Sequence, residues 1–107
     1  MIHFKPYYAV IFTSSQSKHT NGYIEMANKM ELLAKQQDGY LGMESARDSL
    51  GITVSYWESL EAIKKWKQQS EHLQAQLKGR EDWYNWYHVR ICKVEREYEF
   101  TKVESTI

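Results

Sequence analysis

The sequence predicts an α+β domain whose elements follow the order strand, helix, strand, strand, helix, strand. Three observations support this order. A run rich in aromatic and β-branched residues opens the chain, two later segments carry apolar residues at helical spacing, and two short extended runs are separated by three residues. The same order characterises the ferredoxin-like βαββαβ fold, an antiparallel four-stranded sheet with both helices on one face.

The first predicted strand spans residues 7–14, YYAVIFTS, and follows Pro6. Alternate residues of a strand point to opposite faces of its sheet, and here both sets are largely apolar. Two helices can cover only one face of the sheet. The second face is therefore predicted to pack against the same face of another copy in a two-fold homodimer.

The first helix is predicted from apolar and aromatic residues that recur every three or four positions. They are Tyr23, Met26, Ala27, Met30, Leu33 and Ala34. Thr20 or Asn21 is the expected N-cap, because a side-chain oxygen there can accept a hydrogen bond from the first turn. Asp38-Gly39 is the expected stop of the helix.

The next two strands are predicted at residues 40–47 and 51–57, joined by a short loop over residues 48–50. Extended runs this close in sequence are typical of a β-hairpin, so these two strands are expected to pair.

A second helix is predicted from an N-cap at Ser59 to a stop at Gly79, with a break near residues 69–71. The final strand is predicted within residues 80–97, where apolar and polar residues alternate again. Cys92 alternates with its neighbours there and is expected to be a small interior residue.

Length and composition favour one domain, which we place at residues 1–96, with residues 97–107 as a tail or short added strand. The chain has 107 residues, with 14 basic and 14 acidic side chains. This even balance predicts no nucleic-acid or membrane partner. A single cysteine excludes an internal disulfide, and no leader or membrane span is recognisable, so we expect a cytoplasmic location.

Two stretches carry a resemblance to a known family, GYIEMANKMELLAKQQDGYLGMESARD and GITVSYWESLEAIKKWKQQSEHLQAQ. With the opening strand, they resemble the antibiotic biosynthesis monooxygenase domain family, over residues 7–96. The resemblance implies a dimeric α+β barrel. It also implies one of several activities, since the family includes cofactor-free quinol or anthrone oxygenases and haem-degrading enzymes.

The resemblance extends to only some of the functional residues of the family. In the haem-degrading branch, a Trp on the second helix is followed ten residues later by an iron-ligating His. Trp66 matches the Trp, but Gln76 stands in the place of the His, and residues 7–12 lack that branch's Asn. The anthrone-oxidising branch has an Asn one turn before the Trp, where this chain has Ala62. The match therefore disfavours haem degradation.

His72 is the candidate catalytic base for oxygenation without a cofactor, and Trp66 is the candidate pocket wall. The two residues are six apart, about 240° around an ideal helix, so they share a cavity only if the helix kinks or the pocket wraps its end. The alternative is that His72 is a partly exposed helix residue paired with Glu71 or Gln76.

Further candidates for substrate binding are Trp57, Trp86 and Arg47. The tryptophans, Trp83 included, either line a pocket for a flat ligand or fill a thin core. Arg47 either binds the substrate or joins an ion pair at the dimer interface, and the same choice holds for Glu44.

Negative findings narrow the chemistry. The chain has no metal-binding His or Cys spacing, no glycine-rich phosphate loop and no nucleophile elbow. We therefore expect a monooxygenase that needs neither metal nor cofactor and acts on a small quinol- or anthrone-like aromatic with molecular oxygen. The competing hypothesis is a non-catalytic homodimer that binds a small molecule or serves in stress.

Overall fold

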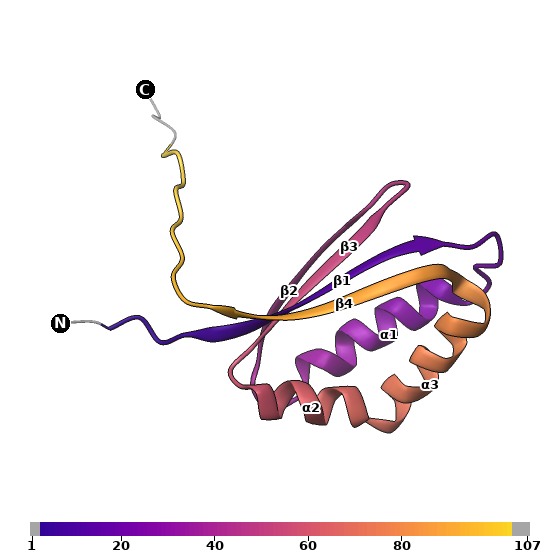
Figure 1. The fold of residues 1–107 in the computed structure, drawn as a ribbon, viewed down its shortest axis with the longest axis horizontal. Coiled ribbons are helices and arrows are strands. Elements are labelled where there is room, and N and C mark those ends of the chain that lie inside the picture. Colours follow the sequence, from indigo (N-terminus) through magenta and orange to yellow (C-terminus); the bar gives the residue numbers. More distant parts are fainter. Residues whose placement is uncertain (1–2, 104–107) are drawn as a thin grey trace.

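The computed structural model describes residues 3–103, which form a single layer of sheet covered by helices (Figure 1). The elements are β1 (Tyr7–Gln16), α1 (Tyr23–Lys35), β2 (Tyr40–Arg47), β3 (Gly51–Trp57), α2 (Leu60–Gln68), α3 (Ser70–Lys78), a π-helical turn (Gly79–Trp83) and β4 (Tyr84–Val94). The predicted hairpin strands have the expected bounds.

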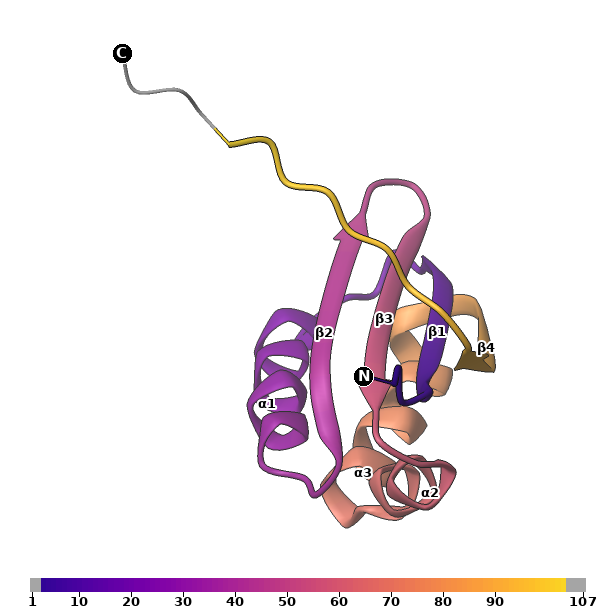
Figure 2. The ribbon, with the colours of Figure 1, turned by 90° about the vertical axis from the view of Figure 1, so that its left-hand side faces the viewer.

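The four strands form one antiparallel sheet in the order β2-β3-β1-β4. All helices lie on one face of this sheet, with α1 behind β2 and α3 behind β1 and β4 (Figures 1 and 2). The fold is therefore the predicted ferredoxin-like α+β fold. No element of residues 3–103 covers the opposite face, which we call the outer face.

The core lies between the sheet and the helices. It is a buried cluster composed of Ala34, Trp57, Ala62, Ile63 and Trp66. Tyr8 and Val10 of β1 pack against this cluster, so the even-numbered residues of β1 face the helices and the odd-numbered ones face outward.

The ends of α1 differ from the prediction. The helix is preceded by Gly22 at φ 81°, with no side-chain cap, instead of Thr20 or Asn21. The Thr20 carbonyl accepts a hydrogen bond from the Tyr23 amide, and this turn enters the helix through the left-handed glycine. The helix ends at Lys35, before the predicted Asp38-Gly39 stop, because backbone and side-chain amides of the following glutamines already cap its last carbonyls.

The second helical segment begins at the predicted N-cap, where the Ser59 hydroxyl accepts a hydrogen bond from the Ala62 amide at 3.0 Å. The predicted break is also present, since Gln69 has extended backbone angles and separates α2 from α3. The α-helix ends at Lys78 with Gly79 as its C-cap, as predicted. The π-turn that continues from Gly79 to Trp83 was not predicted, and the buried Trp83 indole donates to the Asn21 carbonyl at 2.9 Å.

The last strand begins at Tyr84 and ends at Val94, within the predicted range. Cys92 is exposed, not interior, because it lies opposite Ala9 on the uncovered outer face of an edge strand. Residues 95–103 adopt neither helix nor strand and run away from the sheet (Figure 1). The domain boundary at residue 96 stays a prediction, and residues 104–107 of the predicted tail lie outside the described residues.

Within residues 3–103, the helices are too short or too polar for any of them to cross a membrane.

Candidate functional site

Three aromatic side chains from consecutive elements form a stack beneath the sheet. The ring centres of Trp57 and Trp66 are 6.0 Å apart with an interplanar angle of 25°, and those of Trp66 and His72 are 4.1 Å apart with an angle of 18°. Trp57 is fully buried and Trp66 nearly so. The structure thus brings together the candidate base and two of the candidate wall residues.

The break at Gln69 makes this stack possible. In a continuous helix the side chains of Trp66 and His72 would diverge, since six residues correspond to about 240° of rotation. Extended angles at Gln69 redirect the chain, and α3 then returns His72 over the Trp66 indole. The kink that the sequence required for a shared site is therefore present.

Hydrogen bonding fixes the orientation of the His72 ring. Its Nδ1 lies 2.8 Å from the carbonyl oxygen of Trp66. A carbonyl can only accept, so Nδ1 carries a proton, and the neutral ring then keeps Nε2 as its proton acceptor. The backbone amide of His72 donates to the Gln69 side chain at 2.9 Å, which anchors the residue from its main chain as well.

The pKa of His72 lies below its ordinary value of 6.5. Burial is the main cause, because the charged imidazolium loses hydration. The hydrogen bond to the Trp66 carbonyl acts in the opposite direction, and the charge of Lys67 lowers the pKa further. With its pKa below 6.5, the His72 ring is mainly neutral at pH 7, and its Nε2 carries no proton.

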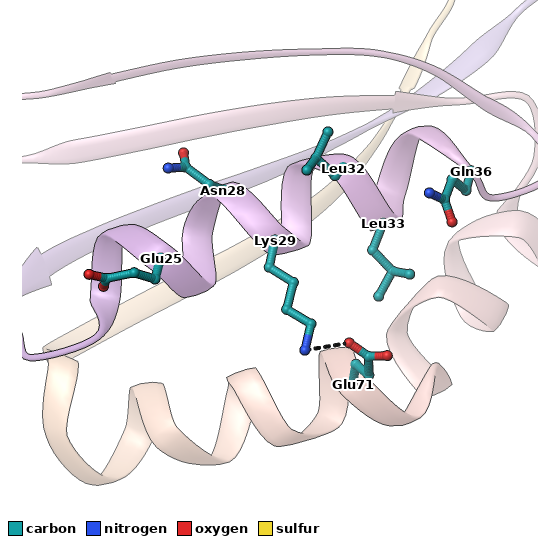
Figure 3. Close-up of a pocket in the computed structure, with 7 residues that line it drawn as sticks. All are labelled: Glu25, Asn28, Lys29, Leu32, Leu33, Gln36 and Glu71. Carbon is teal, nitrogen blue, oxygen red and sulfur yellow. Dashed lines mark ion pairs between the residues drawn. The ribbon is translucent and has the colours of Figure 1, made fainter.

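The expected alternative partners of His72 are engaged elsewhere. Gln76 donates its side-chain amide to the Lys67 carbonyl at 3.1 Å, so it caps the end of α2. Glu71 forms an ion pair of 2.9 Å with Lys29 of α1 (Figure 3). Neither residue hydrogen-bonds the His72 side chain within residues 3–103, so the expected pairing is not observed, although His72 is a partly exposed residue of α3.

The Lys29–Glu71 pair crosses a groove of about 440 Å³ between α1 and α3 (Figure 3). The groove is lined mainly by polar α1 side chains together with Leu32 and Leu33. None of the three stacked rings belongs to its lining.

A second pocket, of about 310 Å³, lies between α1 and the β2–β3 hairpin. It is lined by Tyr23, Ile24, Ala27, Asn28, Ser45, Ala46, Arg47, Ile52 and Thr53. Arg47 is thus the one predicted substrate-binding residue that contributes to either of these two pockets.

The Arg47 guanidinium rests over Gly51 and donates a hydrogen bond to the hydroxyl of Ser14, which is fully buried. Its central carbon also lies 5.9 Å from the centre of the Tyr23 ring. Glu44 does not pair with it, but accepts a hydrogen bond from the Tyr56 hydroxyl at 2.7 Å.

The Arg47 pocket and the aromatic stack occupy opposite ends of β3. Gly51, beneath the guanidinium, and Trp57, in the stack, are six residues apart, which corresponds to about 20 Å of strand. Trp86 is separate from both, because it lies on the outer face and is 48% exposed. The structure therefore does not gather the five predicted site residues into one cavity.

Two phenols near Arg47, those of Tyr23 and Tyr84, were not among the site residues predicted from the sequence. Burial raises the pKa of Tyr84, and the neighbouring Tyr23 raises it further, whereas the charge of Arg47 opposes the shift. Both rings also pack edge to face at 5.8 Å. The sequence signal that could have indicated this site is Gly51 at the start of β3. A glycine within a strand often marks a place where another group approaches the backbone closely, as Arg47 does here.

Within the described part of the chain, no group of three or more His, Cys, Asp or Glu side chains is arranged to hold a metal ion.

Comparison with known proteins agrees with the fold and identifies the family. Residues 7–95 match the family model described as monooxygenase af470-like. The uncharacterized protein YqjZ of Bacillus subtilis (strain 168) is 52% identical over 97 residues, covering 89% of this chain and 85% of the relative.

Solved structures add support for the fold alone, because their sequence identity is low. PA3566 from Pseudomonas aeruginosa has a TM-score of 0.69 at 16% identity, covering 91% of this chain and 100% of the other. A mutant of SnoaB, a cofactor-independent oxygenase from Streptomyces nogalater, has a TM-score of 0.74 at 8% identity, covering 88% and 97%. The chain therefore belongs to the monooxygenase af470-like family, which is of the antibiotic biosynthesis monooxygenase type.

Proposed function

We propose that the protein is a cofactor-independent monooxygenase that oxidises a small, flat, hydroxylated aromatic with molecular oxygen. Membership of a monooxygenase family supports the general activity. The observation that carries the finer proposal is His72, a neutral imidazole stacked on Trp66 with Nε2 as its proton acceptor.

An anthrone-like substrate suits this chemistry because it supplies its own electrons. Removal of a proton gives an electron-rich anion that can reduce oxygen directly. Conversion of the ring CH₂ to C=O then incorporates one atom of O₂ and releases the other as water, with both hydrogens taken from the substrate. The balance requires neither an external reductant nor a redox cofactor.

In this proposal His72 takes the substrate proton at Nε2, and its lowered pKa keeps it deprotonated at neutral pH. Trp66 packs against the His72 ring and holds it in place, and Trp57 supports Trp66 from the buried side. Trp66 is only 8% exposed and is already covered by these two rings, so the substrate ring would lie against the half-buried His72 imidazole, in an environment that favours electron transfer from a desolvated anion.

We also propose that a second copy of the chain covers the outer face. Ile52 and Trp86 on this face are 42% and 48% exposed, and the sheet has no other cover within residues 3–103. Trp86 would then contact the partner subunit or substrate across the interface. The single cysteine supports a cytoplasmic location as part of the same proposal.

The test is oxygen uptake by the purified protein with dithranol, an anthrone, and with menadiol, after subtraction of autoxidation. His72→Ala is expected to reduce the catalysed rate by about a hundredfold or more. The matched control is His19→Ala, which removes an exposed loop imidazole and leaves the rate unchanged. Undiminished uptake in folded His72→Ala would exclude His72 as the base.

A non-catalytic small-molecule-binding protein is the second candidate. The cap that His72 and Gln76 place on the last carbonyls of α2 favours it, because this role explains both side chains without catalysis. Saturable quenching of tryptophan fluorescence by the same aromatics, without any oxygen consumption, would support this function instead.

A further inference from the structure

The pocket between α1 and the β2–β3 hairpin contains the Arg47 guanidinium, and the register of the sheet determines the position of this side chain. Arg47 of β2 is paired with Gly51 of β3, which in turn is paired with Ser14 of β1. A Cβ atom on Gly51 would lie 2.1 Å from the guanidinium carbon. Only glycine therefore lets the Arg47 side chain cross β3 and reach the buried Ser14 hydroxyl.

In this position the positive charge of Arg47 has no counter-ion within residues 3–103. Within residues 3–103, no carboxylate lies within ion-pair distance of Arg47. Its hydrogen bond to Ser14 uses one of five N–H donors, so donors remain for a ligand. The Tyr84 phenol nearby stays protonated because its pKa is raised, and it adds no negative charge.

The start of α1 adds little charge to the pocket. Tyr23, the first residue of α1, lines the pocket, but its amide already donates to the Thr20 carbonyl. The partial positive charge of the helix N-terminus is also offset by the carboxylate of Glu25 in the first turn. The Arg47 guanidinium is therefore the main positive group of the pocket.

The remaining walls of the pocket differ in character. Ile24 and Ala27 of α1 form an apolar wall, whereas the hairpin side chains that share the face of Arg47 are the polar Ser45 and Thr53. A volume of about 310 Å³ is at the lower end of the range for small-molecule sites. The pocket therefore fits a compact organic molecule with one anionic end.

We propose that this pocket binds a small organic carboxylate, with the carboxylate on Arg47 and its apolar body against Ile24 and Ala27 of α1. A planar guanidinium matches a carboxylate with two parallel hydrogen bonds. A phosphate group is less suited, because this pocket offers a single cation. The site is distinct from the proposed oxygenase site, which lies at the other end of β3.

The experiment is an NMR titration of the uniformly ¹⁵N-labelled full chain with benzoate as the probe. The Trp83 indole is a suitable reporter, because its ring lies 5.6 Å from that of Tyr23 and its N–H is fixed on Asn21. We expect saturable shifts with benzoate. Benzamide, which has the same shape but no charge, is expected to bind about tenfold more weakly or worse.

Two arginine variants distinguish a specific contribution of Arg47 from a general effect of positive charge on the protein. Arg47→Gln is expected to weaken benzoate binding about tenfold or more, whereas Arg90→Gln, an exposed arginine on the outer face, leaves it unchanged. Ala27→Leu keeps Arg47 but fills the pocket from α1, so it should also abolish saturable binding. Ala27→Leu also covers the case in which Arg47→Gln fails to fold.

Three results would overturn the proposal: benzoate shifts that do not saturate, equal benzoate affinity in Arg47→Gln and wild type, or tighter binding of inorganic phosphate than of benzoate. His72→Ala tests whether the carboxylate site is independent of the proposed oxygenase site. It should leave benzoate binding intact, so that loss of oxygen uptake and loss of carboxylate binding are separate outcomes.

Discussion

The imidazole of His72 lies nearly parallel to the indole of Trp66, with 4.1 Å between ring centres, although six residues separate them in the chain. The same two residues share a hydrogen bond from the His72 ring to the Trp66 carbonyl. At the end of α2 that carbonyl also accepts the backbone amide of Gln69 at 3.2 Å, so it serves both the helix cap and the imidazole. A single break in the helix therefore both creates the stack and supplies the acceptor that orients the imidazole.

Gln69 is expected to control this break. Its side chain accepts a hydrogen bond from the His72 amide at the start of α3. Gln69→Ala should therefore lower the free energy of unfolding by about 1 kcal/mol, the usual effect of losing an N-cap. Gln68→Ala, one residue earlier and exposed, is the matched control and should change it little. Urea denaturation measures both, and equal losses would argue against the cap.

The lowered pKa of His72 predicts an acid-sensitive fold. Between the folded-state pKa and 6.5, the unfolded chain binds more protons than the native protein, so stability falls as pH falls through this window. His72→Gln keeps an N–H donor for the Trp66 carbonyl but cannot titrate.

Thermal melting from about pH 7.5 to about pH 5.5 tests this linkage. The wild-type melting temperature should decrease more steeply with acidification than that of His72→Gln. The pH dependence that remains in His72→Gln comes from all other titrating groups, so the difference between the two proteins is due to His72. Parallel pH profiles for the two proteins would mean that His72 has the same pKa in the folded and unfolded states.

The sequence was sufficient to predict the fold because local periodicity determines its elements. The hairpin at residues 40–57, the N-cap at Ser59 and the break at Gln69 each depend on residues close in sequence. Strand pairing then follows from few topological alternatives. The shared position of Trp66 and His72 was predictable only as a condition, since it required the kink.

The remaining features depend on contacts between distant segments. The π-turn after Gly79 is held by Trp83, which reaches Asn21, 62 residues away. The position of the Arg47 side chain depends on its hydrogen bond to Ser14, 33 residues away, and on the register that places Gly51 between them. No local pattern specifies such pairs, so neither the turn nor the contents of the Arg47 pocket could be predicted.

Gly39 and Gly42 form a matched pair for testing backbone strain. Gly39 has φ +84°, and a Cβ atom there would lie 2.7 Å from the Cβ of Ala62. Gly39→Ala should therefore lower the free energy of unfolding by about 2 kcal/mol or more. Gly42 has no positive φ, and its added Cβ would meet Tyr56 at 3.9 Å, an ordinary contact. Gly42→Ala should be tolerated, and a comparable loss in both variants would contradict the assigned strain.

Trp83 and Trp86 lie three residues apart but are predicted to respond in opposite ways to the same change. Trp83 is 4% exposed and donates its indole N–H to the Asn21 carbonyl, whereas Trp86 is 48% exposed on the outer face. Trp83→Phe removes the donor, leaves that carbonyl without its partner and opens space in the packing around Tyr23. The expected loss of unfolding free energy is about 2 kcal/mol, against less than about 0.5 kcal/mol for Trp86→Phe. Urea denaturation at low protein concentration measures both without a contribution from association. Equal losses would show that the Trp83–Asn21 contact does not hold the π-turn against α1.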